Sequence, residues 1–178
     1  MALNHFSAKL MNRFLLETAS YVEMSRCLAV ARSAFDLMTA DDKEKHVRLN
    51  ADLMNSQGLL LAHRGDFAGS EEVVLKAIRV RPQQNATDLI GISWAYCNIG
   101  NILASSGRFT EALLWAEKAI ATRAEAQQAK DKKLSPEGVL MQNMGRILHR
   151  LNQYDTAQVH FKKAIEEFAH SENWAMLA

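Results

Sequence analysis

Three basic side chains, Arg146, His149 and Arg150, gather in one short stretch near the C-terminal end of the chain. A guanidinium group binds a carboxylate through two parallel hydrogen bonds, so a basic edge of this kind suits an acidic side chain of a ligand. An ordinary solvated helix face explains the same three residues equally well, and the sequence leaves both interpretations open.

Motifs of catalytic, cofactor and metal sites are absent from the sequence. There is no G-x-x-x-x-G-K-[ST] phosphate loop, no H-E-x-x-H pair and no C-x-x-C pair. The six histidines show no metal-ligand spacing. We therefore expect no catalytic residue, no cofactor and no bound metal.

Composition limits the class of protein further. The 178 residues carry a net charge of +1 without a run of six like charges, which argues against a nucleic-acid or anionic-membrane surface. No apolar run approaches the roughly 18 residues of a membrane span, and the first ten residues do not read as a secretory signal. The two cysteines, Cys27 and Cys97, are few for a secreted scaffold. We expect both to be reduced inside a cell, in the cytoplasm.

One skeleton of glycine, aromatic, small residue and alanine returns three times. The aromatic follows the glycine by nine residues, the small residue by three more and the alanine by seven more, and the copies lie 42 and then 45 residues apart. The copies are Gly58, Phe67, Ser70, Ala77; Gly100, Phe109, Ala112, Ala119; and Gly145, Tyr154, Ala157, Ala164. An inner spacing that recurs along a chain indicates a repeat array.

Each copy predicts two antiparallel helices. In the second copy, apolar residues at helical spacing predict one helix over about residues 88–105 and another that Thr110 opens as N-cap. Gly107 is expected to take the left-handed conformation between them, and Asn152 to do so in the third copy.

Small residues predict where helices approach each other. Gly100 and Ala112 fall where the two helices of a pair should cross most closely, since a glycine is otherwise less favourable than alanine in a helix interior by up to about 1 kcal/mol. Ala119 leaves room for the first helix of the following unit.

The expected units cover about residues 4–40, as a degenerate copy, and then 43–82, 86–128 and 136–170. Residues 171–178 read as the start of a further helix, which favours a fragment of a larger protein; a short capping helix is the alternative. If Trp174, Met176 and Leu177 are exposed there, they favour a homodimer through this end.

The skeleton resembles the tetratricopeptide repeat, whose pattern is W-x2-L-G-x2-Y, then A-x3-F, an alanine and a proline. The matching residues are Tyr96, Ile99, Gly100, Leu103, Ala112, Ala116 and Ala119 in the second copy, and Met141, Met144, Gly145, Leu148, Ala157, Phe161 and Ala164 in the third. The units exceed the usual 34 residues by about eight to eleven, and the extra residues are expected after the second helix, as in residues 122–134. Long units resemble those of kinesin light chains and of arrays in signalling and sensor proteins. The resemblance implies an all-α, right-handed solenoid of antiparallel helix pairs.

The resemblance also implies a concave groove lined by the first helices, with ligand contacts from fixed positions on them. Those positions are Asp52, Asn55, Leu59, Ala62, His63; Trp94, Cys97, Asn98, Asn101, Ser105; and Gln142, Asn143, Arg146, His149, Arg150. Asn98, Asn101 and Asn143 match asparagines that bind peptide backbone in peptide-binding members, because an amide offers both a donor and an acceptor. Bonds to neighbouring helices are the alternative for these amides. Trp94 is either a ligand anchor or a core residue that packs against Leu89.

One variant of the family clamps a peptide's C-terminal carboxylate with lysines and arginines. Asn55, Leu59 and Val139 occupy key clamp positions in this sequence, which argues against that activity. We predict a non-enzymatic scaffold that binds a protein or peptide in its groove, and neither nucleic acid nor membrane. The alternatives are a ligand- or peptide-sensing regulatory module of a multidomain signalling protein and a self-association module.

Overall fold

The computed structural model describes residues 21–128 and 138–170, and every regular element in them is an α-helix. The chain falls into two compact units, Met1–Pro82 and Gln83–Ala178. No helix in the described ranges is long and apolar enough to cross a membrane.

The first unit is built around one helix hairpin. Helices α5 (Val47–His63) and α6 (Phe67–Val80) pair with each other, and α3 (Tyr21–Asp36) and the short α4 (Ala40–Lys45) contact α5. The buried apolar residues that hold α3 on α5 are Met24, Leu28, Phe35, Leu49, Leu53 and Leu60. Helix α3 is covered on the side that faces α5. Its other side therefore also carries exposed apolar residues.

The small residues of the skeleton lie at the contact between α5 and α6. The hydroxyl of Ser70 donates a hydrogen bond of 2.6 Å to the carbonyl oxygen of Gly58, so the two backbones are close together there. At the turn, the carboxylate of Asp66 accepts a hydrogen bond of 2.9 Å from the amide of Gly69 and caps α6.

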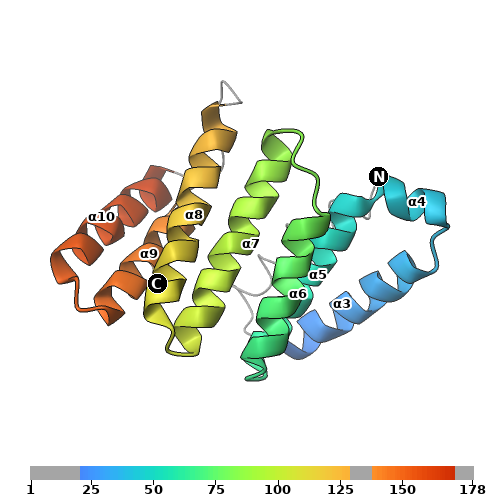
Figure 1. Cartoon of the computed structure of the whole chain (residues 1–178), viewed down its shortest axis with the longest axis horizontal. Coiled ribbons are helices and arrows are strands. Elements are labelled where there is room, and N and C mark those ends of the chain that lie inside the picture. The colour runs from blue at the N-terminus through green and yellow to red at the C-terminus, as the bar shows by residue number, and fades with distance from the viewer. Residues whose placement is uncertain (1–20, 129–137, 171–178) are drawn as a thin grey trace. The chain divides into compact units, whose positions relative to one another are not determined.

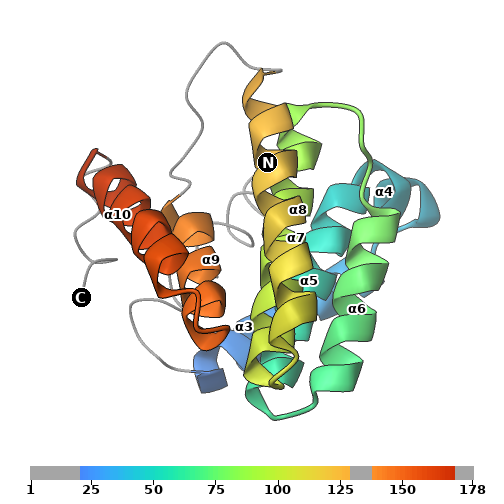
Figure 2. The same ribbon diagram turned by 60° about the vertical axis from the view of Figure 1, so that its left-hand side comes forward.

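The second unit consists of two hairpins. Helices α7 (Ala86–Ser105) and α8 (Phe109–Gln128) form the first pair, and α9 (Gly138–Arg150) and α10 (Tyr154–His170) form the second. Helix α9 packs against both α8 and α7, and α7 and α8 run side by side in both views (Figures 1 and 2). Consecutive antiparallel hairpins that stack in this way define an all-α solenoid, which confirms the predicted fold class.

Both predicted left-handed turn residues are confirmed. Gly107 has φ 83°, and Asn152 has φ 62° and is the only described non-glycine residue with positive φ. Each ends the first helix of its pair, because the left-handed conformation turns the chain back within a few residues.

The glycines of the skeleton mark close helix contacts, as predicted. A Cβ added at Gly100 would lie 3.3 Å from the carbonyl oxygen of Ala112, and one added at Gly145 would lie 2.7 Å from Cε1 of Phe161. Ala119 packs in one buried cluster with Leu140 of the next hairpin, where a larger side chain would hold the two helices apart.

Two predictions of local structure are wrong. Thr110 is not an N-cap, because α8 already begins at Phe109 and the Arg108 carbonyl accepts the first helical hydrogen bond from Ala112, at 2.9 Å. Residues 122–128 are not a loop but the last turns of α8, a stretch of good helix formers in which Arg123 and Ala126 are buried.

Some predictions concern residues outside the described ranges. They are the first helix of the unit at residues 4–40 and the helix start at residues 171–178. Of the unit expected at residues 4–40, the structure describes helix α3. The short helix α4 follows, and the sequence pattern did not predict it.

Candidate functional site

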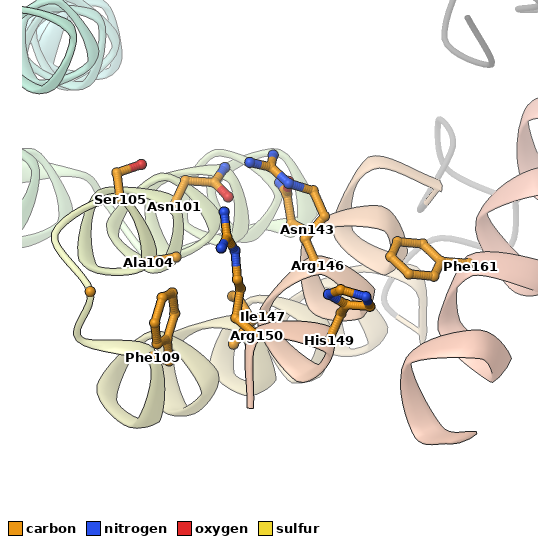
Figure 3. A pocket seen from close by; sticks show the side chains of 11 residues that line it. Asn101, Ala104, Ser105, Phe109, Asn143, Arg146, Ile147, His149, Arg150 and Phe161 are labelled. Carbon is orange, nitrogen blue, oxygen red and sulfur yellow. The ribbon is translucent and has the colours of Figure 1, made fainter. Parts of the chain in front are cut away.

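A pocket of about 570 Å³ lies where the C-terminal ends of α7 and α9 meet (Figure 3). It is lined by Asn101, Ala104, Ser105, Gly107, Phe109, Asn143, Arg146, Ile147, His149, Arg150 and Phe161. Six of the fifteen positions expected to contact a ligand are among them: Asn101, Ser105, Asn143, Arg146, His149 and Arg150. Its volume lies in the range of ordinary ligand pockets, roughly 300–1,000 Å³.

Positive charge dominates the lining of this pocket. Arg146 and Arg150 are exposed, successive turns of α9 carry them, and no aspartate or glutamate is among the lining residues. In Figure 3 both arginine side chains extend toward the α7 wall, where Asn101 and Ser105 lie. Neither arginine forms an ion pair within residues 21–128 and 138–170, so both guanidinium groups are available to an anionic group.

Apolar side chains close the pocket at its two ends. Phe109 lies on the side of the α7–α8 turn, and Phe161 comes from α10 on the opposite side, beside His149 (Figure 3). In the sequence, both aromatics stand out only as residues of the repeat pattern. Their role in the pocket follows from their positions on either side of the basic edge. These positions become apparent only when the hairpins are stacked.

Asn143 has a structural partner on the neighbouring hairpin. Its side chain is 7% exposed, and its amide nitrogen donates a hydrogen bond of 2.9 Å to the sulfur of Cys97 on α7. For the amide nitrogen of Asn143, the expected bond to a neighbouring helix is therefore correct. Asn143 joins α7 to α9 at the floor of the pocket.

Burial governs the ionisation of Cys97. Removal from water raises the pKa of its thiol to about 11, while the hydrogen bond from Asn143 and the charges of Arg123 and Arg146 act in the opposite direction. The thiol is protonated at neutral pH and serves as a hydrogen-bond acceptor in the core.

Trp94 lies away from the pocket. Its ring is half-buried against the cluster of Cys97, Ala119 and Leu140, and the guanidinium carbon of Arg123 sits 5.0 Å from the ring centroid. Arg123 itself is 1% exposed. Sequence reasoning missed this buried cation on α8, which packs over the ring of Trp94.

The remaining candidates do not line the pocket. Asn98 and Gln142 are half-buried on α7 and α9. In the first unit, the carboxylate of Asp52 pairs with the buried Arg81, and the ring of His63 stacks on Tyr21. These two side chains hold their own unit together.

Comparison with known proteins identifies the family. Two models described as tetratricopeptide repeat match residues 49–125 and 140–168, which together make up more than half of the chain. The chain belongs to the tetratricopeptide-repeat family, whose repeats generally mediate protein–protein interactions. The resemblance to kinesin light chains stays a prediction.

Other comparisons add little. No curated protein matches the chain. A solved structure described as "MamA RS-1 ArsTM double mutant" is 18% identical with a TM-score of 0.36, over 93% of this chain and 96% of that one.

Proposed function

We propose that this chain is a binding scaffold and that the pocket between the C-terminal ends of α7 and α9 holds an acidic side chain of a protein or peptide partner. The observation that carries the proposal is the pair Arg146 and Arg150 in a pocket without a lining carboxylate. A charge of one sign, left uncompensated in a concave site, attracts a group of the opposite sign.

The chemistry of the lining favours a carboxylate on a peptide over a free small anion. Guanidinium groups can bind a carboxylate in a bidentate manner, while Asn101 offers a donor and an acceptor to the main chain beside it. Phe109 and Ile147 supply apolar walls for the aliphatic part of a glutamate or for its neighbours. The mixture of apolar walls and few polar groups is typical of sites that recognise a side chain together with its backbone.

In this proposal the candidate residues have different roles. Arg146, Arg150 and Asn101 contact the partner, and Asn143 positions α9 against α7 through its bond to Cys97. Trp94, Asn98 and Gln142 lie outside the pocket and are not part of the contact that we propose.

A peptide array tests this function. Short peptides that carry glutamate are compared with the same peptides carrying glutamine, using the whole chain and its Arg146→Ala and Arg150→Ala variants. We expect the parent to prefer glutamate and each variant to bind about five- to tenfold more weakly, because a charge-assisted hydrogen bond in a pocket contributes roughly 1–1.5 kcal/mol. Arg79→Ala, on an exposed face of α6, is the matched control.

The screen also has a clear negative result. If the parent binds glutamate and glutamine peptides equally, or if the two arginine variants bind as Arg79→Ala does, the pocket is not the binding site. Raising the salt concentration should weaken the glutamate preference, because exposed charges are screened over about 10 Å at 0.1 M ionic strength.

A further inference from the structure

A second pocket of about 360 Å³ adjoins the first. It is lined by His149, Tyr154, Asp155, Ala157, Gln158 and Phe161. His149 and Phe161 line both pockets, so the two share a wall formed by one residue of α9 and one of α10. Figure 3 shows these two side chains next to each other at the α10 end of the first pocket. The two pockets therefore lie next to each other on this side.

The charges of the two pockets are opposite. The second pocket contains the exposed carboxylate of Asp155 and neither a lysine nor an arginine. Asp155 forms no ion pair with any residue in the described ranges. Asp155 lies in the first turn of α10, where its negative charge offsets the positive end of that helix, and it is exposed.

Tyr154 presents a fixed aromatic surface at the second pocket. Its hydroxyl donates a hydrogen bond of 2.7 Å to the side-chain oxygen of Asn152, and its ring stands edge-on to His149 with centroids 5.2 Å apart. The ring is nevertheless 56% exposed. An aromatic face that is already held in place loses little entropy when a cation binds over it.

We propose that the second pocket is a subsite for a basic side chain of the same partner. The preferred ligand then carries a glutamate or aspartate for Arg146 and Arg150, and, a few residues away, a lysine or arginine for Asp155 and Tyr154. This proposal rests on the proposed function of the first pocket, because one ligand is meant to span both. The proposal requires that the ligand carry an acidic and a basic side chain at a defined separation. A basic groove alone would require only the acidic side chain.

The test compares three sets of short Gly/Ser peptides against the whole chain. One set carries glutamate alone, one carries glutamate with lysine at a separation of about two to six residues, and one replaces that lysine by leucine. We expect lysine at the best separation to strengthen binding by about fivefold over glutamate alone, which is the scale of one ion pair combined with one cation–π contact at an exposed site. A leucine that strengthens binding as much as lysine would overturn the proposal, because the subsite would then be apolar.

Variants assign the effect to the second pocket. Asp155→Asn should remove most of the lysine advantage and leave glutamate-only binding unchanged, whereas Arg146→Ala should weaken all three sets. Tyr154→Ala should also remove most of the lysine advantage. Tyr154→Phe keeps the ring and should keep most of the advantage. Glu166→Gln, on an exposed part of α10 about three turns further on, is the matched control. If Asp155→Asn keeps the full lysine advantage, the subsite is wrong while the first pocket stands.

A separate measurement keeps the two proposals distinguishable if no glutamate peptide binds. Nα-acetyl-arginine methylamide, titrated at millimolar concentration, should shift the backbone amide NMR signals of residues 154–158 in the parent and not in Asp155→Asn. Equal shifts in both proteins, or none in the parent, would overturn the second subsite independently of the peptide results.

Discussion

The side-chain amide nitrogen of Asn143 on α9 donates a hydrogen bond of 2.9 Å to the sulfur of Cys97 on α7, and both side chains are buried. This bond connects the first helices of two successive repeats directly. Because Asn143 also lines the basic pocket, the same residue belongs to the packing of the repeats and to the floor of the site.

Asn143→Ala should lower the free energy of unfolding of the chain by about 1–2 kcal/mol, because a buried hydrogen bond and part of the packing at the interface of α7 and α9 are lost. Urea denaturation measures the change. A double-mutant cycle with Cys97→Ala should give a coupling energy above about 0.5 kcal/mol, since the two side chains contact each other. Strict additivity would show that the bond contributes nothing.

Gly145→Ala should destabilise the chain by about 1–3 kcal/mol, although alanine is the better helix former, because its methyl group would overlap the ring of Phe161. Combination with Phe161→Leu should recover much of this loss, because the smaller side chain makes room for the methyl group. Thermal unfolding followed by circular dichroism compares the single and double variants. If the second change only adds its own destabilisation, the clash with Phe161 is not the cause.

The two left-handed turn residues should respond in opposite ways to substitution. Gly107→Ala places a Cβ at φ 83° and should cost about 1 kcal/mol, whereas Asn152→Gly relieves a φ of 62° and should be neutral or stabilising in the turn. Asn152→Gly also removes the acceptor for the Tyr154 hydroxyl. Urea denaturation of both variants tests the signs, and two losses of equal size would contradict the assigned backbone conformations.

The two cysteines should differ strongly in reactivity toward Ellman's reagent. Cys27 is exposed on α3, while Cys97 is buried with its pKa raised to about 11. Between pH 7 and about 9 the native chain should show one fast thiol, and the second should react only on unfolding, since the thiolate is the attacking species. The raised pKa also means that the unfolded chain releases this proton first, so stability should fall as the pH rises from about 9 toward 11. Two fast thiols at neutral pH would contradict the burial of Cys97.

The sequence allowed the hairpins and their turns to be predicted because the residues that determine them act locally. Gly107 and Asn152 end their helices through their own backbone conformations, and Gly100 marks a close crossing within a single repeat. The α8 boundaries were missed because Thr110 and the residues after Thr122 allow more than one local structure. In the structure α8 continues to Gln128, and Arg123 within this stretch packs against Trp94.

The candidate site was predictable only in part. Arg146, His149 and Arg150 stand out in the sequence as a basic edge, and the structure places all three in one pocket. The contributions of Phe109 and Phe161, and the bond from Asn143 to Cys97, depend on how one hairpin stacks on the next. No spacing within a single repeat records that relationship, so these residues could not be assigned from the pattern.

The central proposal is that Arg146 and Arg150 bind a carboxylate of the partner. Reversing the charge of both residues tests it most directly. Affinities of the parent and of the Arg146→Glu, Arg150→Glu double variant are measured by fluorescence anisotropy for one peptide in its glutamate and lysine forms. Both arginines are exposed, so the double variant should fold as the parent does. We predict that the parent prefers the glutamate form by about tenfold and that the double variant prefers the lysine form, because the charge of the pocket has changed sign. An unchanged preference in the double variant, or no preference in the parent, would contradict the proposal.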